Sequence, residues 1–272
     1  MAEGLHEPSD KRVRVEHGGH IVADTDRAVL VWEPRRIVPS YAIPTEDVRA
    51  ELEPADPVPG LPDPAALAML HPGIPFAVHT TEGRSLTVST PAGRAPASAF
   101  RPDDPALSGY VILDFFSFDA WFEEDERIVG HPRDPFKRID VRRSSRHVRI
   151  ELDGRVLAES SRPILLFETG LPVRFYLPRE DVRTELLRPT STRTWCAYKG
   201  EASYWSLDVG EHTLEDLVWT YEQPLGEAAD VVGRLAFFDE RVDVVLDGVP
   251  REQPDTEFTR VGWQDGTKRS VE

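Results

Sequence analysis

The sequence is poor in cysteine, because Cys196 is the only one in 272 residues. A single thiol excludes an internal disulfide and a cysteine-rich zinc site. The chain also lacks an uninterrupted apolar run of about 18 residues, the length that spans a bilayer. Its first residues, MAEGLHEPSDKR, lack the basic and apolar regions of a secretion signal. We therefore expect a cytoplasmic protein that does not associate with membranes.

Basic residues are also in short supply. The chain has 32 Lys and Arg against 48 Asp and Glu, which gives a formal net charge of -16. Nucleic acids and anionic membranes are bound through clustered Lys and Arg, so neither is an expected partner. The oligomeric state does not follow from the sequence.

Motifs for metals and nucleotides are missing as well. The eight histidines do not cluster, and no H-E-x-x-H accompanies them. Neither G-x-x-x-x-G-K-[ST] nor G-x-G-x-x-G occurs. We expect no metal site and no cofactor.

What the sequence does contain is an internal repeat. Val13 aligns with Val148, and the match continues without a gap to Glu33 and Glu168. The identical pairs are Val13/Val148, Arg14/Arg149, Glu16/Glu151, Gly19/Gly154, Ala23/Ala158, Arg27/Arg162, Leu30/Leu165 and Glu33/Glu168. A second matching block, EDVR, begins at Glu46 and again at Glu180. The chain is predicted to be two diverged copies of one small domain.

The composition of each copy favours strands. VRVEHGGHIVAD and VRIELDGRVLAE alternate around a Gly-containing turn, a pattern that predicts a hairpin. RAVLVWE and RPILLFE predict a third, more buried strand. Each EDVR segment follows a proline, which predicts a short helical turn there with ion pairs inside the domain. ASYWSLDVG, LEDLVWTYE, GRLAFFD and RVDVVLDG predict four further strands in the second copy, with GEAADVV as a short helix. A mostly β fold is expected.

Three ranges describe the expected domains. The first domain covers residues 11–130 and carries a Pro-rich insert from Glu53 to Pro75. A linker rich in proline and charge follows at 131–146, and the second domain covers 147–250. Residues 1–10 and about the last twenty lack periodicity and are expected to be mobile.

These motifs carry a family resemblance that covers nearly the whole chain. RVRVEHGGHIVADTDRAVLVWEP, the repeated EDVR, HPRDPFKRIDVRRSSRHVRIELDG, TWCAYKGEASYWSL and LVWTYEQP resemble the bacterial domain-of-unknown-function family 427 in a two-copy form. The resemblance implies tandem β-tent-like domains, each with antiparallel sheets that lean together. The family's C-x-x-K-G-x-A-x-Y motif stands in the second copy, whereas the first has VHTTEGRSLTV, without Cys or Lys. A Gly-Ser turn ahead of an Asp-x-Asp pair, the arrangement of a nucleotidyltransferase, does not occur.

The motif of the second copy holds the residues with most chemistry. Cys196, Lys199 and Glu201 lie within six residues, so a lysine beside a thiol can lower the pKa of that thiol or bind a substrate carboxylate. These three are the candidate catalytic residues. The alternative is a buried cysteine that packs as a small hydrophobe and a lysine at a turn before Gly200.

Aromatic residues surround this motif and continue along the next two strands. Alternation puts Tyr204 and Ser206 on one face, and Trp219 and Tyr221 on one face of the following strand. Together these side chains predict an aromatic-lined pocket, which would bind a small molecule or a peptide group. The candidate ligand-binding residues are Trp195, Tyr198, Tyr204, Ser206, Trp219 and Tyr221.

Three functions remain open. The first is binding of a small metabolite or peptide group in that pocket of the second domain. The second is a metal-independent enzyme that uses Lys199, Cys196 and Glu201, and the third is a purely structural interaction protein. Lys199 is expected to be exposed, so Lys199→Ala should remove the function and leave the melting temperature nearly unchanged.

Overall fold

The computed structural model describes residues 5–209 and 212–256. The chain divides into two compact units, residues 1–134 and residues 135–272, called here the first unit and the second unit. Within the described residues each helical segment is a 3-10 turn of three to six residues, and none is long and apolar enough to cross a bilayer. The predicted mostly β fold of antiparallel sheets is confirmed.

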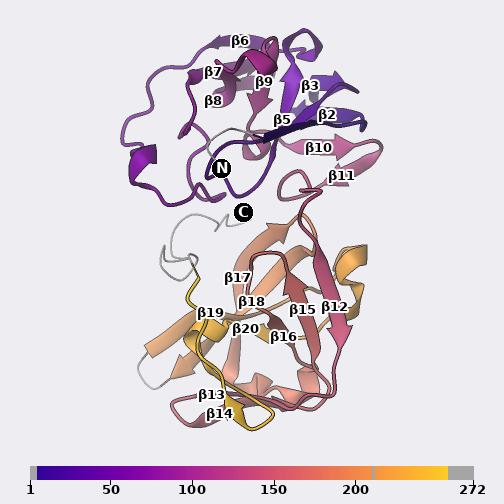
Figure 1. The fold of residues 1–272 in the computed structure, drawn as a ribbon, viewed down its shortest axis with the longest axis vertical. Helices are drawn as coiled ribbons and strands as arrows, with labels where there is room; N and C mark the ends of the chain where they lie inside the picture. Colours follow the sequence, from indigo (N-terminus) through magenta and orange to yellow (C-terminus); the bar gives the residue numbers. More distant parts are fainter. Residues whose placement is uncertain (1–4, 210–211, 257–272) are drawn as a thin grey trace. The chain divides into compact units, whose positions relative to one another are not determined.

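The first unit contains a seven-stranded and a four-stranded antiparallel sheet (Figure 1). The large sheet has the order β1 (Leu5–Pro8), β4 (Val29–Trp32), β5 (Ser40–Pro44), β9 (Tyr110–Leu113), β8 (Gly93–Pro102), β7 (Gly83–Thr90), β6 (Glu51–Pro54). The small sheet has the order β11 (Glu126–Ile128), β10 (Ala120–Glu123), β2 (Val13–His17), β3 (His20–Thr25). Alternate apolar residues of both sheets, among them Val15, Ile43 and Trp121, form one core.

The second unit is built from three antiparallel sheets (Figure 1). They are β12 (Ile139–Arg143), β15 (Ile164–Glu168), β16 (Arg174–Tyr176); β17 (Leu187–Cys196), β18 (Gly200–Val209), β19 (His212–Thr220), β20 (Ala236–Phe237); and β14 (Arg155–Ser160), β13 (Val148–Leu152), β21 (Asp243–Leu246), β22 (Val249–Pro250). Leu177 and Leu235 exchange backbone hydrogen bonds of 2.8 and 2.9 Å between the first two sheets. With that link, the two sheets have the combined order β12-β15-β16-β20-β19-β18-β17. This order matches that of the large sheet of the first unit strand for strand, with β12 in the place of β1 and β17 in the place of β6.

Both predicted hairpins form. β2 pairs with β3 across Gly18 and Gly19, and β13 pairs with β14 across Asp153 and Gly154. All four turn residues have positive φ, as a two-residue turn between twisted strands requires. Three of the four are glycines, which adopt this conformation without strain. A register shift follows Val15 in the first hairpin and Ile150 in the second. The two hairpins therefore share their irregularities as well as their strands.

The EDVR segments form the predicted short helical turns with ion pairs. The turns are Thr45–Asp47 and Arg179–Asp181. Arg27 pairs with Asp47 at 2.9 Å, and Arg162 pairs with Asp181 at 3.0 Å. Each aspartate also accepts a hydroxyl hydrogen bond, from Thr25 at 2.6 Å in the first unit and from Ser160 at 2.7 Å in the second.

Two strands lie where no strand was expected. β1 lies in the N-terminal segment expected to be mobile, and β12 lies in the predicted linker. Each forms an edge of its sheet, and pairing through the backbone does not require an apolar side-chain pattern. β17, for which the sequence analysis made no prediction, has a register shift between Pro189 and Arg193. Most of the C-terminal segment expected to be mobile lies outside the described residues.

Candidate functional site

Lys199 lies in the turn between β17 and β18, where its ammonium pairs with the carboxylate of Glu168 at the end of β15. Lys199 is 9% exposed. The expectation of an exposed lysine is therefore wrong. The β17–β18 hairpin brings Lys199 against Glu168 of β15, so the charge of the lysine is compensated inside the protein instead of by water.

The surroundings keep this lysine charged. Burial alone would lower the pKa of Lys199, but Cys196, Glu168 and Tyr176 outweigh it and raise that pKa above its ordinary value. A lysine with a raised pKa does not supply a neutral amine nucleophile at pH 7. The ion pair therefore fits a structural role for Lys199 better than a covalent one.

The aromatic residues of the predicted pocket gather beside this pair. Tyr204 stands opposite Trp219 in the β18–β19 register, and both are buried together with Tyr221. The Trp219 indole N–H donates to the Tyr176 hydroxyl at 3.1 Å, and the Tyr204 hydroxyl lies 2.7 Å from Thr194 Oγ1. The rings thus pack against one another as a core.

Burial also perturbs the phenols. It raises the pKa of Tyr176 and of Tyr204 to about 12 and that of Tyr221 well above its ordinary value. These hydroxyls remain protonated at pH 7, which suits hydrogen bonding within a core.

Other predicted site residues are placed differently. Glu201 is exposed and its carboxylate lies 3.5 Å from Arg193 Nε. Ser206 follows the register shift after Trp205, and its buried hydroxyl donates to Glu215 at 2.8 Å. Trp195 is half-buried, and Tyr198 is buried in the turn before Lys199. The structure therefore unites Lys199 with Cys196 and the aromatic core, while Glu201 and Ser206 bond elsewhere.

The first unit has a buried carboxylate in the corresponding place. Glu33, which aligns with Glu168, accepts hydrogen bonds from the Thr80 backbone N–H and, at 3.2 Å, from the Thr80 hydroxyl. The register shifts of β7 at Leu86/Val88 and of β18 at Trp205/Leu207 align the two strands, and this alignment puts Thr80 where the second unit has Lys199. A hydroxyl thus replaces the ammonium.

The missing cation is supplied by other residues. Arg36 Nε donates to Glu33 Oε2 at 2.8 Å, and His79 Nδ1 lies 3.2 Å from the same oxygen. Burial would raise the pKa of Glu33, but His79, Arg36 and the Thr80 N–H outweigh it and lower that pKa to about 2. Glu33 is therefore ionised and paired inside its unit, and Glu168 is likewise paired inside the second unit.

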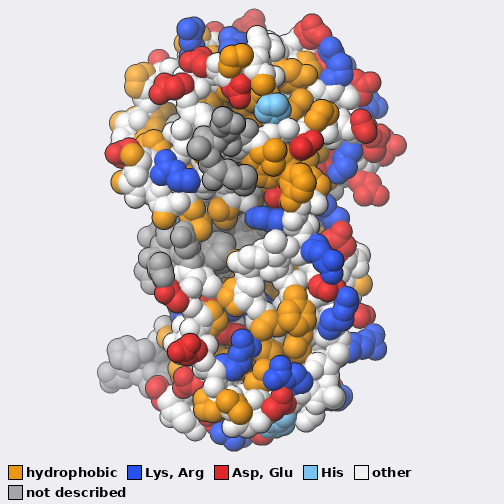
Figure 2. Space-filling model, viewed as in Figure 1, with side chains coloured by type: hydrophobic (Ala, Val, Ile, Leu, Met, Phe, Trp, Pro, Cys, Tyr) orange, Lys and Arg blue, Asp and Glu red, His pale blue; other side chains and the backbone are white. Residues whose placement is uncertain are grey.

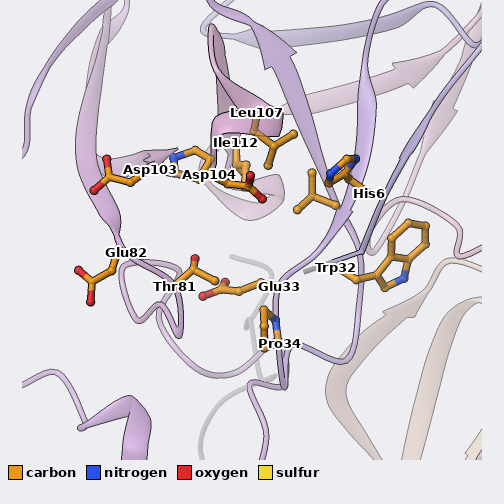
Figure 3. Close-up of a pocket in the computed structure, with 12 residues that line it drawn as sticks. His6, Trp32, Glu33, Pro34, Thr81, Glu82, Asp103, Asp104, Leu107 and Ile112 are labelled. Carbon is orange, nitrogen blue, oxygen red and sulfur yellow. The ribbon is translucent and has the colours of Figure 1, made fainter. Parts of the chain in front are cut away.

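A pocket opens beside Glu33 in the first unit (Figure 3). Its volume is about 320 Å³, within the range of small-molecule sites. In the view of Figure 3, Glu82 and Asp103 lie on the side opposite His6 and Trp32, with Glu33 and Asp104 between them. The lining comes from β1, β4, β8, β9, the segment before β7 and the turn Pro105–Leu107.

Metal coordination is not supported by side-chain clustering. In residues 5–209 and 212–256, no three His, Cys, Asp or Glu side chains come close enough together to hold a metal ion.

The comparison with known families agrees with the fold. The model of the family described as domain of unknown function 427 (DUF427) matches residues 5–58 and 140–248. The chain belongs to the DUF427 family. None of the curated proteins matches the chain.

The DUF427 match separates the two candidate sites. It begins at β1 and near the start of β12, and it includes Glu33, Glu168 and Lys199. The segment 59–139 is unmatched, and it supplies Thr81, Glu82, Asp103 and Asp104 to the pocket. The buried carboxylate thus lies within the family match, while much of the pocket belongs to the part of the first unit outside it.

Proposed function

We propose that this DUF427 protein binds a small molecule in the pocket of the first unit. The carrying observation is the cavity itself, which lies beside an ionised, internally compensated glutamate. Its walls combine apolar side chains with a few polar groups, the composition of ligand sites. No catalytic step is assigned to it.

Comparison of the two units supports this choice. The second unit has Tyr176, Tyr204 and Tyr221 in its buried aromatic core. With the strands aligned through their pairing, the first unit has smaller side chains at these positions, Ala42, Ser85 and Pro102. Of these three residues Pro102 lines the pocket, so a smaller side chain at the position of Tyr221 leaves room for a ligand there.

We also propose that the two units are diverged copies of one domain. The shared strand order, the matching hairpin irregularities and the two equivalent Arg–Asp pairs support a duplication. Copies that keep a fold can diverge in function, because fold and site depend on different residues.

The alternative of a binding site around Lys199 stays a prediction, as does the enzyme hypothesis. The buried ion pair and the packed tyrosines favour a structural role for this region. An enzyme that uses Glu201 together with Lys199 has little support, because Glu201 pairs with Arg193.

A pocket-blocking variant tests the proposal. The intact protein is screened against a metabolite library by thermal shift, and hits are measured by calorimetry, since a ligand of the folded state raises its stability. His6→Trp puts a large ring on edge strand β1 at the pocket wall, and it should abolish binding with little change in melting temperature. His20→Trp, at the exposed first residue of β3, is the control and should bind normally. Equal binding by His6→Trp would refute the assignment.

A further inference from the structure

The pocket of the first unit is lined by four acidic residues and one histidine. Four carboxylates line it, those of Glu33, Glu82, Asp103 and Asp104, and neither Lys nor Arg is among its lining residues. Arg36 compensates Glu33 from outside the lining. The other three carboxylates leave the pocket negative, in a chain whose net charge is already -16.

The body of the pocket is apolar. Its apolar lining residues are Val31, Trp32, Pro34, Pro102, Leu107 and Ile112. The Trp32 indole N–H donates to Asp134 at 3.0 Å, which fixes the ring in place. Asp104 is fixed through Oδ1, which accepts the Ala106 backbone N–H at 2.9 Å. An occupant therefore meets a preformed apolar wall with carboxylates at its margin.

The second unit shows how the equivalent of Glu33 is paired there. There the carboxylate that corresponds to Glu33 pairs with a buried primary ammonium, that of Lys199. The first unit has no lysine at this position, because Thr80 stands there. In the first unit Arg36, His79 and Thr80 already pair with Glu33, so an incoming cation meets the other carboxylates of the pocket, among them Glu82 and Asp103.

The spacing of the carboxylates points to a molecule and not to a bare metal ion. Across the described ranges 5–209 and 212–256, no three acidic, His or Cys side chains converge as metal ligands do. Separated carboxylates around an apolar wall suit a cation that has both an ammonium group and an apolar body.

We propose that the ligand of this pocket is an organic cation, an amine carried on an apolar body. The inference rests on the proposed binding function of the first unit. The ammonium lies toward Glu82 and Asp103, and the apolar body lies against Trp32 and Leu107.

Three probes with one shared ring system test the charge requirement. Calorimetry of the full chain compares 2-phenylethylamine, 2-phenylethanol and phenylacetate, which carry an amine, a hydroxyl and a carboxylate. The amine should bind, and the alcohol and the acid should bind at least about tenfold more weakly. Binding of the amine should weaken as salt is raised, because the carboxylates are partly open to solvent.

Variants of single carboxylates test which of them pair with the amine. Glu82→Gln and Asp103→Asn should each weaken amine binding about tenfold and leave the melting temperature nearly unchanged, since both side chains are exposed. Asp125→Asn, at an exposed turn outside the pocket, is the matched control and should bind as the natural protein does.

The outcomes separate this inference from the proposed function. Binding of the alcohol or the acid as tightly as the amine, blocked by His6→Trp, would keep the binding function and overturn the cation. Amine binding that both carboxylate variants leave unchanged would overturn it too. Absence of binding by all three probes overturns the inference, and the library screen then decides on the proposed function.

Discussion

A glutamate at the end of one strand, Glu33 in the first unit and Glu168 in the second, is paired inside both units. Glu168 is compensated by Lys199, and Glu33 is compensated by Arg36, His79 and Thr80. The acceptor stays while its donors change. This is expected of a group that must be paired in any version of the fold, because an unpaired buried charge is strongly destabilising.

Replacing Lys199 with alanine should therefore destabilise the folded protein. Lys199→Ala leaves the partly buried Glu168 without its cation and should lower the free energy of unfolding by about 3–5 kcal/mol. Denaturant titration of the variant measures the loss. Arg94→Ala, which breaks the exposed pair with Glu53, is the control and should cost less than about 1 kcal/mol. An unchanged stability in Lys199→Ala would mean that the ion pair does not support the fold.

The contribution of Glu33 to the stability of the folded protein should depend on pH. Its pKa in the folded protein, about 2, lies below its ordinary value of 4.5, so its ionised form stabilises the folded state above about pH 4.5. That contribution is lost as the pH falls toward 2. The natural protein should be more stable than Glu33→Gln at pH 7, by about 3 kcal/mol. Denaturant titrations at pH 7, 4 and 3 should show the difference shrinking, and a difference independent of pH would contradict the assignment.

At the scale of elements, the strands with a clear apolar pattern were predictable and the edge strands were not. The hairpins and β15 follow from alternation and from apolar runs. β12 carries Arg and Asp and resembles a linker, because an edge strand is defined by its backbone partner. The EDVR turns were predictable since the segment occurs in both units together with its arginine partner.

The candidate sites divide in the same way. The cluster around Lys199 was partly predictable, because Cys196, Lys199, Tyr204 and Trp219 lie along one hairpin and the next strand. Its burial was not, since the partner Glu168 comes from a strand that sequence spacing does not relate to the motif. The pocket of the first unit combines distant segments, and only Glu33 is marked in the sequence, by its identity with Glu168.

At the scale of the whole molecule, two units with related sheets differ in what lies on one sheet face. The second unit fills it with tyrosine and tryptophan, whereas the first leaves a cavity with an acidic margin. The side chains on the face of the molecule in Figure 2 include acidic and basic residues interspersed with apolar ones. The expectation that the protein does not bind nucleic acid rests on net charge and stays a prediction.

The central claim is that the first unit holds the ligand site, and chemical-shift mapping with 2-phenylethylamine tests it most directly. Backbone amide shifts of the isotope-labelled full chain are recorded during titration with the amine. The account predicts saturable shifts at Thr81, Glu82 and Asp103, and none at Lys199 or Trp219. Shifts concentrated around Lys199 and Trp219 would contradict it and return the site to the second unit.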